Sequence, residues 1–279
     1  MPRLANLVSV VLNPPSGLVL ASAAEAPGPI PPDYFQEIPS NTLQVLTPAD
    51  YGPFREWVAT VPFSLPDTEQ EHVCSLRTFF ELGVVTPCWP GVLAMAEPSP
   101  IRGYDLALMT GSSTATNPAA FHPDICVMHV LDNGDEASPH TELETLAGVE
   151  FLAVDALAPI CDPSYGSDYS LDGGGLFAGR VLDSSPAWRV LTSRLRKYAV
   201  LGDFRHLIVA DDSWAIYFAF SDPANTESSV RYAVTSTGGA SGARTRVAGG
   251  LTLREMFLLS VWAACREYYP IRYSMPPNY

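Results

Sequence analysis

The chain has 279 residues, of which 47% are hydrophobic and 16% are charged, and its net charge is −14. The apolar fraction excludes a disordered chain, and the length suits one large domain or two small ones. A strongly acidic surface repels phosphate backbones, so we expect no direct binding of nucleic acid.

The N-terminal third predicts two strands, over 4–12 and 17–23, joined as a hairpin by the sequence Asn-Pro-Pro-Ser. A proline-rich connector at 26–40 leads to a short helix that begins at Thr47. The clearest helix of this half covers 68–84, because acidic residues occupy its first turn and apolar residues follow at helical spacing.

The middle of the chain predicts strands at 91–96, 104–109 and 125–131. A short helix is expected at 140–147, followed by a strand at 150–158. These strands cluster in sequence and do not alternate with helices, which favours antiparallel pairing.

A polar loop at 162–175 is the best candidate for a domain boundary. It would divide the chain into 1–160 and 176–279, although we expect a single domain over 1–279.

The last third predicts two helices that enclose a group of strands. The first helix begins at Ser184-Ser185-Pro186, and the second begins at a capping box formed by Thr252 and Glu255. The strands between them are expected at 206–210, 214–220 and 229–235. The whole chain is therefore predicted to be an α+β fold of one compact unit, with largely antiparallel strands and about four to five helices.

The compartment is predicted from the N-terminus and the cysteines. Asn6, Asn13 and two prolines interrupt the apolar start, so a cleaved secretion signal is not expected. No apolar run reaches the ~18 residues that a membrane span needs, so neither a span nor a membrane partner is expected. Five cysteines at irregular spacing favour reduced, buried thiols, and we expect a protein of the cytoplasm or of a virion.

Two adjacent carboxylates, Asp211 and Asp212, lie between two apolar strands. A metal site would need further ligands from elsewhere, and short carboxylates commonly cap turns through local hydrogen bonds. We interpret the pair as a turn.

His122, Cys126 and His129 lie close together in sequence, as zinc ligands do. In a strand, however, the third would point away from the other two, and no second pair with ligand spacing follows. Neither a metal nor a cofactor is expected. No catalytic residue is predicted with any specificity.

A cysteine hydrolase is one alternative function. Cys88 would be the nucleophile, with His122, His129 or His206 as its base. The prolines around Cys88 argue against a helix N-terminus that would lower its pKa.

The C-terminal tail alternates tyrosine and proline, a composition that suits an extended segment in contact with protein. The predicted interface residues are Tyr268, Tyr269, Tyr273 and Tyr279.

A second alternative comes from residues 199–262. Their strand pair, AVLGDFRHLIVADDSWAIYF, followed by the terminal helix sequence VAGGLTLREMFLLS, resembles the end of the SMI1/KNR4-like (SUKH) family. The resemblance implies an acidic immunity or interaction module that binds a toxin or another protein. It covers about a quarter of the chain, and the expected opening of the family is missing.

The preferred prediction is a non-enzymatic structural subunit of a protein assembly, such as a viral capsid or surface-protrusion protein. Its partners would be other protein subunits, either copies of itself or a shell protein. Sparse charge, many Pro, Ser and Thr connections and the tyrosine-rich tail all favour this class.

Overall fold

The structure is a computed structural model, and it describes residues 4–6, 18–20, 36–64, 72–96, 104–110, 123–132, 141–161, 186–237, 246–248 and 250–268. The predicted boundary at 162–175 lies outside these residues.

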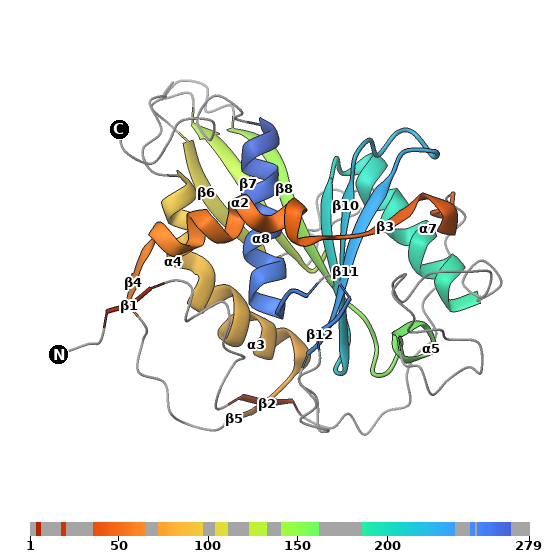
Figure 1. Cartoon of the computed structure of the whole chain (residues 1–279), viewed down its shortest axis with the longest axis horizontal. Coiled ribbons are helices and arrows are strands. Elements are labelled where there is room, and N and C mark those ends of the chain that lie inside the picture. Colours follow the sequence, from red (N-terminus) through yellow and green to blue (C-terminus); the bar gives the residue numbers. More distant parts are fainter. Residues whose placement is uncertain are drawn as a thin grey trace.

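One eight-stranded sheet organises the molecule (Figure 1). Two neighbour pairs of this sheet are parallel, namely β8 (Thr141–Phe151) with β9 (His206–Ala210) and β3 (Leu43–Val45) with β11 (Val230–Ser236). The other neighbour pairs are antiparallel. The expected α+β class is confirmed, and the sheet is mixed, with antiparallel pairs in the majority. In spatial order the strands are β12 (Arg246–Ala248), β11 (Val230–Ser236), β10 (Trp214–Phe220), β9 (His206–Ala210), β8 (Thr141–Phe151), β7 (Ile125–Asp132) and β6 (Tyr104–Thr110), with β3 (Leu43–Val45) also paired to β11.

The predicted N-terminal hairpin is wrong. β1 (Leu4–Asn6) pairs with β4 (Pro62–Ser64), and β2 (Leu18–Leu20) pairs with β5 (His72–Cys74). Each of these strands therefore takes a partner that lies far along the chain.

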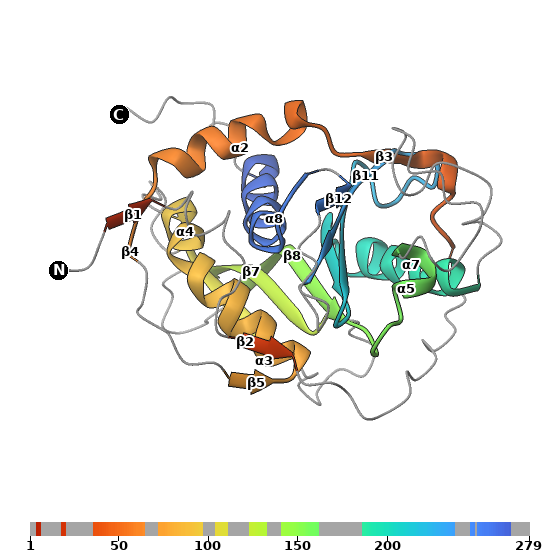
Figure 2. The same ribbon diagram turned by 60° about the horizontal axis from the view of Figure 1, so that its bottom comes forward.

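Helices cover both faces of the sheet (Figure 2). One face carries α2 (Pro48–Thr60), α8 (Leu253–Tyr268) and a continuous helical segment made of α3 (Leu76–Phe80), η2 (Glu81–Val85) and α4 (Thr86–Ala96). The other face carries α5 (Ala158–Cys161) and α7 (Pro186–Leu201), while the short η1 (Ser40–Thr42) precedes β3.

Three elements of the middle third differ from their prediction. The strand expected at 150–158 ends at Phe151, and a turn at 154–157 follows it. Residues 91–96, expected as a strand, form the end of α4, and 140–147, expected as a helix, lies largely in β8. Short apolar runs fit either structure, and in both places the packing of the whole fold decides.

The central strands are buried on both sides, which explains their nearly continuous apolar sequences. All five residues of β9 are buried. Leu207 and Val209 belong to the core under α7, whereas Ile208 and Ala210 belong to the core under α8. Successive side chains of β9 thus point to opposite faces of the sheet and pack into two separate cores.

The predicted capping box at the start of α8 is confirmed. The Thr252 backbone N–H donates to Glu255 Oε2 at 2.8 Å, and the Glu255 N–H donates to Thr252 Oγ1 at 3.1 Å. The same buried Glu255 carboxylate accepts a bond of 2.9 Å from Arg55 Nε, which fastens α2 to α8.

Gly148, in β8, provides a test of this packing. A Cβ at this position would lie 2.6 Å from Pro123 Cγ and 2.9 Å from Leu207 Cδ2. We expect Gly148→Ala to lower the free energy of unfolding by about 1–3 kcal/mol through overpacking. Gly52→Ala is the control, because no atom lies within 4 Å of its Cβ and alanine favours α2. Urea denaturation should show opposite signs for the two variants, and equal effects would contradict the packing described here.

Candidate functional site

Of the four predicted interface tyrosines, the structure describes Tyr268. Tyr268 is the last residue of α8, so the helix extends into the segment that was expected to be extended. Tyr269, Tyr273 and Tyr279 lie outside the described residues, and their role at an interface stays a prediction.

Cys88 belongs to α4 and lies in the hydrophobic core. Its thiol is fully buried and approaches the carbonyl oxygen of Arg254 at 3.9 Å. Burial raises the pKa of this thiol to about 12, which disfavours the thiolate that a nucleophile requires.

His206, one of the bases expected for Cys88, belongs to a different cluster. It is buried, with Nδ1 at 2.8 Å from the Tyr217 hydroxyl and Nε2 at 3.4 Å from Glu267 Oε1. These contacts hold β9, β10 and α8 together.

The sequence cluster around Cys126 also has a structural environment. Its buried thiol contacts the carbonyl oxygen of Pro123 at 3.6 Å, and burial raises its pKa to about 12. His122 lies outside the described residues. Within the described ranges, no group of three His, Cys, Asp or Glu side chains could hold a metal ion.

Asp211 and Asp212 form the turn between β9 and β10, as predicted. The fully buried Asp211 carboxylate accepts backbone N–H groups of Leu157, Ser213 and Trp214 at 2.7, 2.9 and 2.6 Å. Asp212 accepts the N–H of Asp155 at 2.9 Å. The pair therefore closes a turn and fastens it to the chain that leaves β8.

A buried polar cluster joins β8 to α7 and was not found from the sequence. Glu150 forms an ion pair with Arg194 and accepts a hydrogen bond of 3.1 Å from the Tyr198 hydroxyl. Burial raises the pKa of Glu150 to about 7, although Arg194 acts to lower it. Only the four-residue spacing of Arg194 and Tyr198 on one helix hinted at this cluster.

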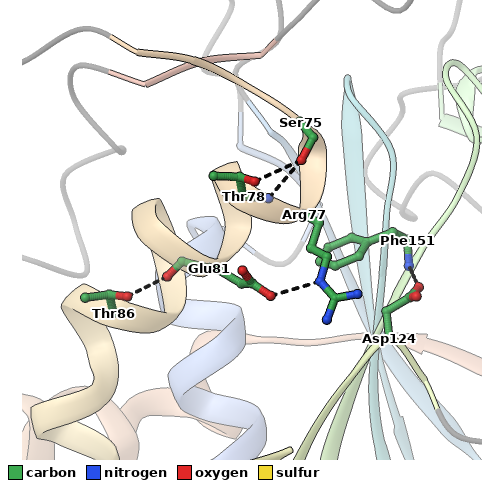
Figure 3. Close-up of polar contacts among 7 residues, drawn as sticks. All are labelled: Ser75, Arg77, Thr78, Glu81, Thr86, Asp124 and Phe151. Carbon is green, nitrogen blue, oxygen red and sulfur yellow. Dashed lines mark hydrogen bonds and ion pairs between the residues drawn. The ribbon is translucent and has the colours of Figure 1, made fainter. Parts of the chain in front are cut away.

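The helical segment Leu76–Ala96 contains one widened turn, η2, directly before Thr86-Pro87 (Figure 3). Pro87 has no N–H for the carbonyl of Gly83, four residues earlier. Arg254 from α8 supplies the missing donor, with Nε at 2.7 Å from Gly83 O. Pro87 thus explains the widened turn, and Arg254 of α8 donates the hydrogen bond to its Gly83 carbonyl.

The N-terminal end of this segment is polar (Figure 3). Ser75 caps α3 by accepting the Thr78 N–H at 3.2 Å, and Arg77 pairs with Glu81 at 2.9 Å. Beside it, the Asp124 carboxylate accepts the Phe151 N–H at 2.8 Å, which holds the end of β8 against the start of β7.

From Leu82 onward the helical segment is apolar on its solvent-facing side as well as on its buried side. Leu82 and Leu93 are 52% and 43% exposed, and Trp89 is half-buried between them. No charged residue occurs from 82 to 96. We call Leu82, Thr86, Trp89, Pro90 and Leu93 the outer stripe. Because a soluble helix normally has a polar outer face, the outer stripe is the surface that most needs a functional explanation.

Among the described helices, one is long and apolar enough to cross a membrane, Leu76–Met95, and 56% of its most apolar window is buried in the protein.

The comparisons add no relative: no protein-family model, no curated protein and no solved structure matches the chain. The likeness of 199–262 to the SUKH family stays a prediction. The predicted strand pair and terminal helix are present there, with β11 and β12 between them.

Cysteine labelling tests the structural interpretation of Cys88. Because its thiol is buried and its pKa is raised to about 12, we expect no modification of Cys88 by iodoacetamide at pH 7 in the folded protein. Unfolding in urea should expose it, and peptide mass spectrometry reads out both states. Rapid labelling of native Cys88 would support the hydrolase alternative.

The raised pKa of Glu150 makes the free energy of unfolding depend on pH. The Glu150 carboxyl binds a proton more tightly in the folded protein than in the unfolded chain. The contribution of this proton to the free energy of unfolding is therefore complete below about pH 4.5 and is lost as the pH rises through about 7. Over this pH range we expect the free energy of unfolding of the wild type to fall by about 3 kcal/mol relative to that of Glu150→Gln. Urea unfolding at several pH values measures the difference. The exposed Glu56→Gln control should follow the wild type, and a constant difference between wild type and Glu150→Gln would contradict the expectation.

Proposed function

We propose that this protein is a non-enzymatic subunit of a protein assembly and that it contacts a second copy of itself through the outer stripe. The observation that carries the proposal is the exposure of Leu82 and Leu93 on a helix whose inner face is already packed. A helix that is apolar all round is normally covered on both sides.

Charge favours a second copy as the occupant. Two chains of net charge −14 repel each other over most of their surface. The region 82–96 has no charge, so it is a face on which two copies can meet without bringing carboxylates together.

The sheet edge next to α4 supports the same arrangement. α4 packs against β6, and β6 is the last strand of the sheet among the described residues. Its sequence, YDLALMT, has one charge and no proline, features typical of an edge that accepts another strand. Antiparallel pairing of two copies about Ala107 would set position 105 opposite 109, so the two acidic positions would not meet.

The proposal extends to the class of assembly. Virus shells and protrusions are built from such subunits, and a virion or the cytoplasm is the location that we propose. The SUKH-like alternative predicts instead an acidic face that captures one toxin molecule in a one-to-one complex.

Replacement of Leu93 tests the proposal. Burial of one leucine contributes about 1.5–3 kcal/mol, so Leu93→Glu should weaken self-association at least about tenfold. Leu201→Glu, at an equally apolar exposed position on α7, should leave it unchanged. Sedimentation equilibrium measures the dissociation constant, and far-UV circular dichroism verifies folding.

A wild-type chain that stays monomeric at every concentration would contradict the proposal. So would an oligomer that both leucine variants weaken equally, or binding to phosphatidylcholine vesicles that Leu93→Glu abolishes, which would point to a membrane contact.

A further inference from the structure

His206 is a buried histidine that faces a carboxylate on another element. It is the first residue of β9, and its side chain is 3% exposed. Ile208 and Ala210 of the same strand belong to the core under α8, so the alternation of the strand places His206 on that face too. There Glu267, in the last turn of α8, brings Oε1 to 3.4 Å from His206 Nε2.

The residues beside His206 leave room for its ring. Its neighbours in register are Ala147 on β8 and Ala219 on β10, and both side chains are small. The imidazole stacks on the Tyr217 ring, with the two ring planes 13° apart, and Nδ1 lies 2.8 Å from the Tyr217 hydroxyl oxygen. Burial raises the pKa of Tyr217, so this hydroxyl stays protonated.

The charge of the ring decides how strongly His206 and Glu267 attract each other. In a protonated imidazole both nitrogens carry hydrogen, so Nδ1 donates to the Tyr217 oxygen and Nε2 donates to the Glu267 carboxylate as an ion pair. In the neutral ring one nitrogen has no hydrogen, and the ion pair is lost. The contact between β9 and the end of α8 is therefore stronger in the protonated state.

The other charged groups around His206 keep their charge near neutral pH, since arginines stay protonated and carboxylates ionised there. Arg205 Nη1 lies 3.7 Å from Glu267 Oε2, and Arg231, two strands away on β11, is paired with Asp50 of α2 at 2.6 Å. Burial acts to raise the pKa of Glu267, but the contact with His206 and the charges of His206 and Arg205 outweigh it and lower this pKa. Histidine is the side chain whose charge normally changes between about pH 5 and 8.

We propose that His206 and Glu267 form a pH-sensitive latch, which holds the last turn of α8 on β9 when the His206 ring is protonated and loosens that turn when the ring is neutral. Glu267 directly precedes Tyr268, the first of the predicted interface tyrosines, so the latch sets how firmly the end of α8 is held at this point. The latch does not depend on the proposed self-association.

Amide hydrogen exchange of residues 264–268 tests the latch at about pH 5 and about pH 8, after correction for the intrinsic exchange rates. Protection of these amides in the wild type should be at least about threefold higher at the lower pH, as expected for an ion pair with one exposed partner. Glu267→Gln keeps the shape of the side chain and removes its charge, so it should abolish this pH dependence. Arg205→Gln is the matched control, because it removes the other cation beside Glu267 and should keep the pH dependence.

The amides of β10 in the same samples report changes in global stability. The proposal is overturned if the wild type is equally protected at both pH values, if β10 changes by the same factor as α8, or if Glu267→Gln keeps the pH dependence. It is also overturned if Arg205→Gln abolishes the dependence. His206→Gln cannot become charged and should behave as Glu267→Gln does. Glu267→Gln decides the test if the buried variant does not fold, because the Glu267 side chain is 41% exposed.

Discussion

The fold depends on the burial of β9 and β10 on both faces. Strands with apolar side chains on both sides cannot leave either side in water, because each exposed side would cost tens of cal/mol for every Å² of apolar surface. Helices must therefore lie on both faces. The parallel step from β8 to β9 provides one layer, since the chain between these strands includes α5 and α7. α8 completes the other layer together with the N-terminal helices.

Several buried charges of this interior are paired with polar groups of another element, and these pairs link the layers to one another. Glu255 links α2 to α8, Glu150 links β8 to α7, and Asp211 links a turn to the chain after β8. Arg254 takes a further role, since its guanidinium compensates a backbone carbonyl that Pro87 leaves without a donor. In each case a carboxylate or guanidinium joins elements far apart in sequence, which makes the arrangement of layers specific.

The C-terminal half could be predicted because its local signals agree with its packing. Turn chemistry at Asp211 and Asp212, the capping box at Thr252 and the regular apolar strands all lead to the observed elements. In the N-terminal half the helix that follows Thr47 was predicted, but the partners of β1 and β2 were not, because these strands pair with distant strands that no local pattern reveals. Residues 91–96 form a helix despite Pro90, since packing on α8 outweighs the lost hydrogen bond. The outer stripe was also hidden from the sequence, because the exposure of a side chain is known only once the chain is packed.

The pairing of β3 with β11 and the contacts of α2, α3 and α4 with α8 have a consequence for how the protein forms. The first third of the chain finds its neighbours in the last quarter, so the N-terminal helices cannot reach their native environment until α8 has left the ribosome. Such long loops slow the search for the native state. During synthesis the apolar sequence 82–96 stays uncovered on both sides, and in this interval the chain is most exposed to aggregation and to capture by chaperones.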